Sequence, residues 1–253
     1  MSDATASIPS KTVASQTIRD SEAAHFGAMA ADWWNPAGSS AMLHSLNPVR
    51  LRFVRNAIDT HWAGDVRDTE PLRGKTALDV GCGAGLLCEP LARLGAQMTG
   101  LDAAAENVAA ARTHAQGSGL AIDYRHGELS QAGLGQLDLV TCLEVVEHVA
   151  DKPAFLAALA ARLKPDGLLI LSTPNRTAQS RLLLVEGAER LGMIPRGTHH
   201  WDDFVKPEEL EAMLVELGLQ PIERCGIAFR PDKGLHLSDD ESLNYILSAR
   251  FAG

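Results

Sequence analysis

Short apolar segments that alternate with helical patterns between residues 76 and 174 constrain the fold more than any other feature. Each apolar segment has the length of a strand and stops at Gly, Asp or Pro, as buried strands do. The strand-like segments are TALDVG (76–81), QMTGLD (97–102), IDYRHG (122–127), LDLVTCL (137–143) and LLILSTP (168–174). The helical segments between them are LLCEPLARLG (86–95), AAENVAAARTHAQ (104–116) and DKPAFLAALAARLK (151–164). This alternation predicts an α/β fold with a mostly parallel sheet and helices on both faces.

The C-terminal part departs from this alternation. An amphipathic helix, KPEELEAMLVELG (206–218), precedes two further strand patterns, QPIERCGIAF (220–229) and SLNYILSARF (242–251). Because the segment between these two strands, RPDKGLHLSDD (230–240), is rich in turn residues, we expect a closing hairpin. The sequence therefore predicts seven strands, with a C-terminal strand that runs antiparallel to the rest.

Two segments lie outside the strand–helix alternation. Residues 17–62 precede the first strand and are expected to form a helical cap, and residues 175–205 form an insertion before the last helix. Appendages of this kind usually carry the selection of substrate. Residues 1–16 are polar and small, which predicts a disordered lead-in, so residues 17–253 form one domain.

Composition and charge exclude several classes of protein. The formal net charge of −9 argues against general binding of nucleic acid, which needs a positive surface. No apolar run reaches eighteen residues, and the N-terminus has no signal-peptide pattern. The four cysteines form no CxxC pair and accompany no histidines at zinc spacing, so we expect reduced thiols in a cytoplasmic protein.

A turn rich in glycine, LDVGCGAG, follows the first strand, and an acid, Asp102, ends the second strand. Such a turn lets the backbone approach a ligand, and a carboxylate at that place can accept the hydroxyls of a ribose. We therefore expect a cofactor that contains a nucleoside. The spacing of Gly81, Gly83 and Gly85 is GxGxG, and Leu86 stands where a dinucleotide fingerprint has its third glycine.

The turn and the GLD that follows it resemble the signature of class I methyltransferases that use S-adenosylmethionine. The resemblance covers residues 76–174 and implies a Rossmann-like sheet. Asp79, a charge inside a buried strand, indicates contact with something polar. Glu128, after the third strand, is expected to contact the adenine side of the cofactor, and a plain surface acid is the alternative.

The flanking segments resemble the ubiquinone-biosynthesis O-methyltransferase family, from about Phe26 to the C-terminus. Members of this family methylate ring hydroxyls of polyprenylated phenols and catechols, including 3-demethylubiquinone and 2-polyprenyl-6-hydroxyphenol. The resemblance therefore implies the same activity and substrate class here. The segments that carry it are MAADWWNPAGSSAMLHSLNPVRLRFV (29–54), VTCLEVVEHVADKPAF (140–155), STPNRT (172–177) and IPRGTHHWDDFVKPEEL (194–210).

The resemblance implies cofactor contacts at four matched positions: Arg50, Gly81, Asp102 and Leu143. A guanidinium at Arg50 suits the carboxylate of the methionine part, because its planar fork of donors matches that group. A solvated helix arginine is the alternative. Leu143, at the end of the fourth strand, can pack against the adenosine.

CLEVVEHV places Glu144, Glu147 and His148 at offsets of three and four, which share one face on a helix. In eukaryotic relatives the matching residues are implied as Mg²⁺ ligands, and a divalent ion would lower the pKa of a catechol. Magnesium prefers oxygen ligands, and similar strings occur in methyltransferases without a metal. Three roles stay open: metal ligation, His148 as the general base, and support of the cofactor.

The inserted segment has four arginines against two glutamates between residues 175 and 201, a local excess of +2. Leu184, Val185, Ala188 and Leu191 share one helical stripe. One interpretation is a helix that covers the active site. The other is contact of residues 178–196 with the inner face of the cell membrane, where a substrate with an isoprenoid tail resides. The family resemblance agrees with peripheral membrane association.

Three other functions stay open. One is methylation of another small phenol. The second is a cofactor-binding scaffold without turnover in a lipid-biosynthesis complex, since an assembly of ubiquinone-biosynthesis proteins is an expected partner. The third is a dinucleotide oxidoreductase.

Overall fold

The structure is a computed structural model that describes residues 27, 32–38, 40–187 and 200–252, without the side chains of 185–187. The expected lead-in over residues 1–16 lies outside the described residues, as does most of the cap before Ser40. The part of the insertion from 188 to 199, with two residues of its expected stripe, also lies outside them.

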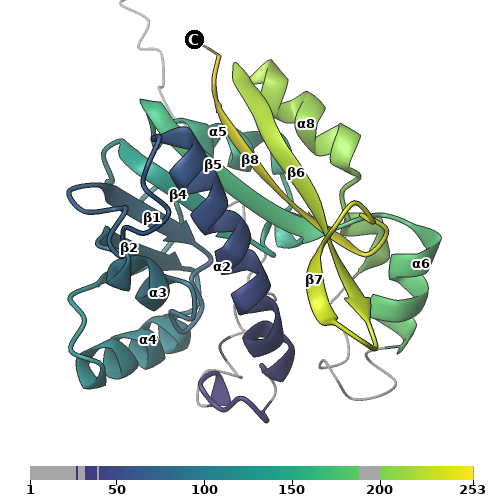
Figure 1. The fold of residues 1–253 in the computed structure, drawn as a ribbon, viewed down its shortest axis with the longest axis horizontal. Coiled ribbons are helices and arrows are strands. Elements are labelled where there is room, and N and C mark those ends of the chain that lie inside the picture. Colours follow the sequence, from purple (N-terminus) through teal and green to yellow (C-terminus); the bar gives the residue numbers. More distant parts are fainter. Residues whose placement is uncertain (1–26, 28–31, 39, 188–199, 253) are drawn as a thin grey trace, which may run out of the picture.

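Eight strands form one sheet, in the order β3-β2-β1-β4-β5-β8-β6-β7. The first five strands pair in parallel, and the pairs β5–β8, β8–β6 and β6–β7 are antiparallel. The expected α/β architecture is confirmed (Figure 1). The strands are β1 (Thr76–Val80), β2 (Gln97–Asp102), β3 (Asp123–His126), β4 (Leu137–Leu143), β5 (Leu163–Pro174), β6 (Leu219–Arg230), β7 (Gly234–Ser238) and β8 (Asn244–Phe251).

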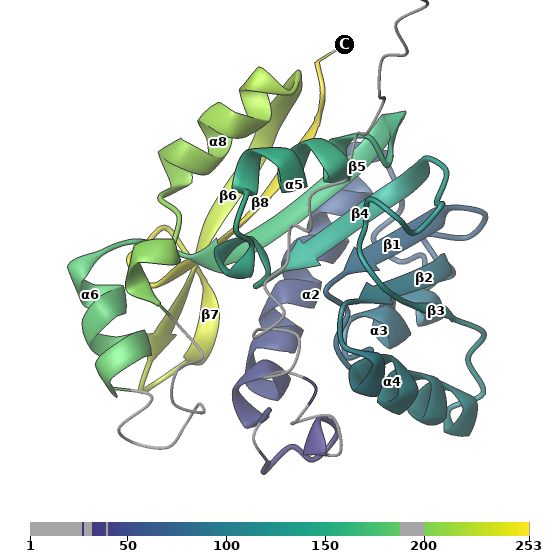
Figure 2. The same ribbon diagram turned by 180° about the vertical axis from the view of Figure 1, so that it is seen from behind.

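Helices cover both faces of the sheet, as expected. Figure 1 looks onto α2 (Ala41–His61), α3 (Cys88–Arg93) and α4 (Ala105–Gly117). Figure 2, seen from behind, shows α5 (Lys152–Ala160) and α8 (Pro207–Glu216) on the opposite face. Asp151 caps α5, because its side chain accepts from the Ala154 N–H at 3.0 Å. The sheet is therefore covered by helices on both faces, and the carboxyl ends of its parallel strands lie at one edge.

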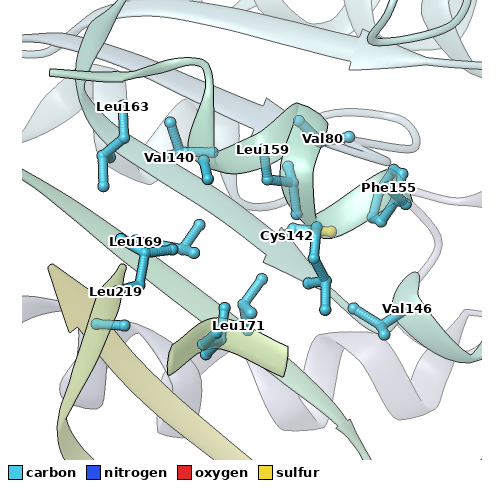
Figure 3. Packing of buried hydrophobic residues seen from close by; sticks show 14 of the residues in the cluster. Val80, Val140, Cys142, Val146, Phe155, Leu159, Leu163, Leu169, Leu171 and Leu219 are labelled. Carbon is cyan, nitrogen blue, oxygen red and sulfur yellow. The ribbon is translucent and has the colours of Figure 1, made fainter. Parts of the chain in front are cut away.

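The core lies in two layers because side chains alternate between the two faces of a strand. On β4, Val140 and Cys142 join the cluster under α5 and α8, and Leu139 joins the cluster under α2, α3 and α4. Figure 3 shows the first cluster, in which Phe155 and Leu159 of α5 lie against the strands. Full burial of each such side chain contributes about 1.5–3 kcal/mol to the stability of the fold.

β7 corrects the expectation of seven strands. It lies in the segment that was expected to be a turn, and pairs with the last five residues of β6. Leu235 and Leu237 alternate with polar neighbours and lie half-buried against the α2 side. These two leucines are enough to add a short edge strand beyond the end of β8. The expected hairpin between β6 and β8 is otherwise confirmed, since these strands pair antiparallel.

The insertion begins with a helical turn, α6 (Ala178–Ser180), which continues as η3 (Arg181–Gly187) with π-helical bonding. Thr177 caps it by accepting from the Ser180 N–H at 3.0 Å. A short helix, η4 (Trp201–Asp203), follows the gap in the described residues. No helix in the described ranges is long and apolar enough to cross a membrane.

Candidate active site

The glycine turn follows β1 at the carboxyl edge of the parallel strands, the usual ligand site in such sheets. Gly81, Gly83 and Gly85 have φ of +74°, +52° and +90°, where other residues are strained. Each glycine also lies against a side chain that a Cβ would overlap. These side chains are Val145 at Gly81, Trp33 at Gly83 and Tyr124 at Gly85. The turn therefore brings three separate segments of the chain together.

Asp102 lies beside the turn, as the sequence predicts. Its Oδ2 accepts from the Gly83 N–H at 2.8 Å, and its Oδ1 accepts from the Ala104 N–H at 2.8 Å and from Asn107 at 3.1 Å. Burial raises the pKa of Asp102, and these donors oppose the rise. Oδ2 takes one hydrogen bond among the described contacts, so a second lone pair can accept from a ligand hydroxyl.

Arg50 is buried on α2, with 3% of its surface exposed. Its Nη2 lies 3.1 Å from Glu144 Oε1, but neither Nη2 nor Nε makes a hydrogen bond within the described part of the chain. Buried guanidinium donors are costly unless an acceptor satisfies them. The alternative of a solvated arginine is therefore wrong, and the geometry fits a bound carboxylate.

Asp79 is the buried charge of β1. Its Oδ1 accepts from the Thr141 hydroxyl at 2.7 Å, and the Cys88 thiol lies 3.6 Å from Oδ2. Burial raises the pKa of Asp79 to about 7, against the opposing effects of Thr141, Cys88 and the positive charge of Arg50. The acid is thus partly protonated at neutral pH and sits within the electrostatic reach of Arg50.

Glu144 and Glu147 do not share a helix, which corrects the sequence expectation. β4 runs through Leu143, and Glu144 extends its ladder, since its N–H donates to Ser172 O at 2.9 Å. Glu144 then takes φ +59°, and only Val146–His148 form a single 3₁₀ turn, η2. A helix does not form over the whole segment because Val146 and Val149 are buried in the core next to β4, which holds the chain there in a short turn.

The Glu144 carboxylate is held by the surrounding chain. Its oxygens accept from the Ser172 hydroxyl at 2.7 Å and from Asn244 Nδ2 at 3.0 and 2.9 Å, in addition to the Arg50 contact. No group of three His, Cys, Asp or Glu side chains in the described ranges is arranged to hold a metal ion. Glu144, Glu147 and His148 as placed here therefore do not fit a magnesium site.

Glu147 and His148 lie side by side next to this network. Glu147 is 2% exposed, its Oε2 accepts from the Thr173 hydroxyl at 2.9 Å, and its Oε1 lies 3.7 Å from His148 Nε2. Burial raises the pKa of Glu147 to about 7, and the nearby Glu144 adds to the rise. The pair places an imidazole and a carboxyl group of raised pKa beside the carboxyl end of β4.

The remaining predicted residues lie around the same edge. Leu143 ends β4 and is half-buried on the α2 side. Glu128 follows β3 in a loop that is tied to β2, because the Gly127 N–H donates to Asp102 O at 2.9 Å. Both residues thus lie at the carboxyl ends of parallel strands, Leu143 on β4 and Glu128 just after β3.

Sequence reasoning missed three polar contributors. The indole N–H of Trp33, the hydroxyl of Tyr124 and one amide oxygen of Asn107 are buried and find no hydrogen-bond partner among the described residues. Of the three residues, only Trp33 lies in a segment that the sequence predicts to be functional, the cap over residues 17–62. A cluster of unsatisfied buried polar atoms around the turn indicates a site built for a polar ligand.

Comparison with known proteins identifies the family of this chain. A family model described as a methyltransferase domain matches residues 54–224. The ubiquinone biosynthesis O-methyltransferase of Azorhizobium caulinodans is 46% identical over 94% of this chain and 95% of its own length. That of Dinoroseobacter shibae is 45% identical over 94% of this chain and 98% of its own length.

Solved structures share the fold at lower identity. The magnesium protoporphyrin IX methyltransferase of Synechocystis, solved with bound SAH, has a TM-score of 0.57 and 23% identity, over 89% of this chain and 99% of its own. The PH0226 protein of Pyrococcus horikoshii also has a TM-score of 0.57, with 14% identity over 87% of this chain and 95% of its own. The Rossmann-like class I methyltransferase fold is confirmed, and by its close sequence relatives the chain belongs to the ubiquinone biosynthesis O-methyltransferase family.

Proposed function

We propose that the glycine turn binds S-adenosylmethionine and that the enzyme methylates ring hydroxyls of polyprenylated phenols and catechols in ubiquinone biosynthesis. The observation that carries the proposal is the buried guanidinium of Arg50, whose Nε and Nη2 lack hydrogen bonds within the described chain although Nη2 lies 3.1 Å from the Glu144 carboxylate. A carboxylate is the acceptor that best matches two such donors. The methionine part of the cofactor supplies one.

Each predicted cofactor residue has a matching task. Asp102 accepts a ribose hydroxyl at its second lone pair, next to Gly81 and Gly83, which keep the turn free of side chains. Leu143 packs against the adenosine from the end of β4. Glu128 lies on the side of Asp102 where the adenine would extend. When bound, the cofactor supplies an electrophilic methyl group on a sulfonium.

The acceptor must lose a proton before or during transfer, and ionising a phenol of pKa near 10 at pH 7 costs about 4 kcal/mol. We propose His148 as the base that takes this proton. Glu147, 3.7 Å away, stabilises the resulting imidazolium. Because Arg50, Ser172 and Asn244 contact the oxygens of Glu144, the proposed proton transfer uses His148 and Glu147 without a metal ion.

The metal question has a direct test. Dialysis against a chelator followed by addition of Mg²⁺ is expected to leave the rate of methyl transfer unchanged. A rate that falls on dialysis and returns with Mg²⁺ would show that Glu144 is released from Asn244 to ligate the ion.

The inserted segment is proposed to meet the membrane surface. Leu182 and Leu183, on the described part of 178–196, are 59% and 46% exposed. Burying such side chains in the interface adds to the attraction of basic residues for anionic lipid. Flotation with anionic liposomes is expected to carry the full chain upward and to fail for a Leu182→Ser, Leu183→Ser variant. Equal flotation of both chains refutes the contact. Association with other ubiquinone-biosynthesis proteins is an extension of this proposal that rests on the family resemblance.

The decisive experiment supplies the purified protein with S-adenosylmethionine and a short-tailed prenylated catechol, and measures formation of S-adenosylhomocysteine. Turnover is expected for the wild type and for Arg52→Ala, an exposed arginine of the same helix. Arg50→Ala should lose most of the activity at low cofactor concentration. Cofactor binding without turnover would favour the scaffold, and turnover of small phenols alone would change the substrate class.

A further inference from the structure

Trp33 lies on the glycine turn. A Cβ added to Gly83 would lie 2.6 Å from the ring atoms Cη2 and Cζ3 of Trp33, so the indole edge touches the backbone of the turn. Its side chain packs with Ala84 and Leu86 in a cluster separate from the two main cores. Trp33 is therefore the nearest side chain above the centre of the turn where the cofactor is proposed to bind.

Trp34 ties this segment to the rest of the protein. Its indole N–H donates to Ala84 O at 3.0 Å. Its ring stacks on His114 of α4 with 3.4 Å between centroids and 4° between planes. His114 in turn lies 2.5 Å, Nδ1 to Oε1, from Glu89, which is 1% exposed. The stack thus has a rigid base on α3 and α4.

Two further bonds come from α2, one to this segment and one to the residue that follows the glycine turn. His44 Nε2 donates to Trp33 O at 2.8 Å, and Asn47 Nδ2 donates to Leu86 O at 2.9 Å. Since α2 also carries Arg50, one helix contacts the tryptophan segment and the turn and presents the buried guanidinium.

The indole N–H of Trp33 is the exception in this well-bonded segment. Trp33 is 8% exposed, and its Nε1 makes no hydrogen bond to any described residue. An indole nitrogen can only donate, and a buried donor without an acceptor is unfavourable. The ring atoms that meet Gly83 belong to the six-membered ring, so Nε1 lies on the other side of the indole and faces away from the backbone of the turn, where the Gly83 N–H donates to Asp102.

From this arrangement we infer that Trp33 is a cofactor-contacting residue that closes over the glycine turn, with its indole N–H donating to an oxygen of S-adenosylmethionine. Trp34 is the positioning residue that holds Trp33 there through Ala84 and His114. The inference rests on the proposed cofactor site. It assigns to the tryptophan pair a role in holding the cofactor, and not only in selecting the substrate.

The test measures the affinity of S-adenosylhomocysteine by calorimetry in three chains. Trp33→Phe, which keeps a ring but removes the donor, should weaken binding about tenfold, or about 1.4 kcal/mol. Trp62→Phe is the matched control, because Trp62 packs on Lys75 at the start of β1, one strand length from the turn. Its affinity should stay within twofold of the wild type.

Trp34→Phe tests the positioning role through a rate. It should speed dissociation of S-adenosylhomocysteine several-fold, as followed by stopped-flow tryptophan fluorescence, and the effect should not add to that of His114→Ala, since both break one stack. Additive effects of the two substitutions would refute the positioning role of Trp34.

A Trp62→Phe, Trp201→Phe chain, which keeps only Trp33 and its positioning neighbour Trp34, guards against misfolded variants. Its fluorescence should change on titration with S-adenosylhomocysteine. Unchanged fluorescence, or unchanged affinity in Trp33→Phe, overturns the inference while the cofactor site stands. Failure of the wild type itself to bind S-adenosylhomocysteine overturns the proposed function instead.

Discussion

At the scale of single residues, Gly83 combines a left-handed backbone with a close neighbour. Its φ is +52°, and the Trp33 ring occupies the space of a Cβ. Gly133 has φ +59° with nothing within 4 Å of its Cβ position, so it isolates the backbone effect. The two glycines therefore form a matched pair.

Gly83→Ala is expected to lower the free energy of unfolding by about 2–5 kcal/mol, the sum of left-handed strain and overpacking. Gly133→Ala should lower it by about 1–2 kcal/mol from strain alone. Urea unfolding measures both. In a Trp33→Ala background, Gly83→Ala and Gly133→Ala should lower the free energy of unfolding by the same amount. A difference that persists there would contradict the contact between Trp33 and Gly83.

Asp79 gives a prediction on pH. The pKa of its carboxyl rises from an ordinary value of 3.8 to about 7 on burial, so the folded state binds the proton more tightly than the unfolded state. The stabilisation is complete below about pH 4 and is lost as the pH rises to about 7, by at most about 4 kcal/mol.

Asp79→Asn removes this titration while Asn keeps an acceptor for Thr141. The free energy of unfolding of the wild type, minus that of the variant, should therefore fall between pH 4 and pH 7.5 in the absence of cofactor. Urea unfolding at four pH values gives this difference. A difference in free energy of unfolding that stays constant with pH would show that Asp79 stays ionised in the folded protein.

The predicted residues that the structure brings together are those whose positions follow from local pattern. The turn and Asp102 each end a strand, and parallel neighbours place their ends at one edge. Asn244, by contrast, reaches Glu144 across 100 positions of sequence, and β8 that carries it gives no motif. Contacts of this kind depend on sheet order, which no local pattern encodes.

At the scale of elements, the segment after β4 and the strand β7 are places where the spacing of residue types in the sequence predicts the wrong secondary structure. The spacing of Glu144, Glu147 and His148 suits a helix, yet the strand ladder reaches Glu144 and leaves room only for the short turn η2. β7 was hidden because glycine and charged residues surround its two leucines. In both cases pairing with a neighbouring strand outweighs the local preference.

β7 and β8 should differ in hydrogen exchange. β7 has one partner, β6, and forms the edge of the sheet, whereas β8 lies between β5 and β6 and is buried through residue 249. Amides of β7 are expected to exchange through local opening well before those of β8. Mass spectrometry of peptic peptides measures this, with β8 as the internal control. Equal protection would mean that another surface covers the edge in solution.

At the scale of the whole molecule, the two core layers meet at the carboxyl edge of the sheet. The cap reaches that edge with Arg50 of α2 and with Trp33, which precedes α2, and the strands bring Asp79, Asp102 and Glu144 to it. A ligand there would contact segments that span positions 33 to 144 of the chain. Its binding must therefore stabilise the fold as a unit and not one element alone.

S-adenosylhomocysteine at a hundred times its Kd should stabilise the folded state by about 2.7 kcal/mol. For a chain of this size that shift raises Tm by roughly 5–11 °C, which differential scanning calorimetry resolves. NAD at the same concentration should leave Tm unchanged, because Leu86 replaces the third glycine of a dinucleotide turn.

Arg50→Ala links this stabilisation to the site. It should reduce the shift caused by S-adenosylhomocysteine, while Arg52→Ala retains it, because only Arg50 offers buried donors to the carboxylate. Removing these charged hydrogen bonds weakens binding by about 2 kcal/mol, roughly thirtyfold, so most of the shift should vanish at the same ligand concentration. A full shift in Arg50→Ala would place the carboxylate elsewhere and would remove the main support for this cofactor geometry.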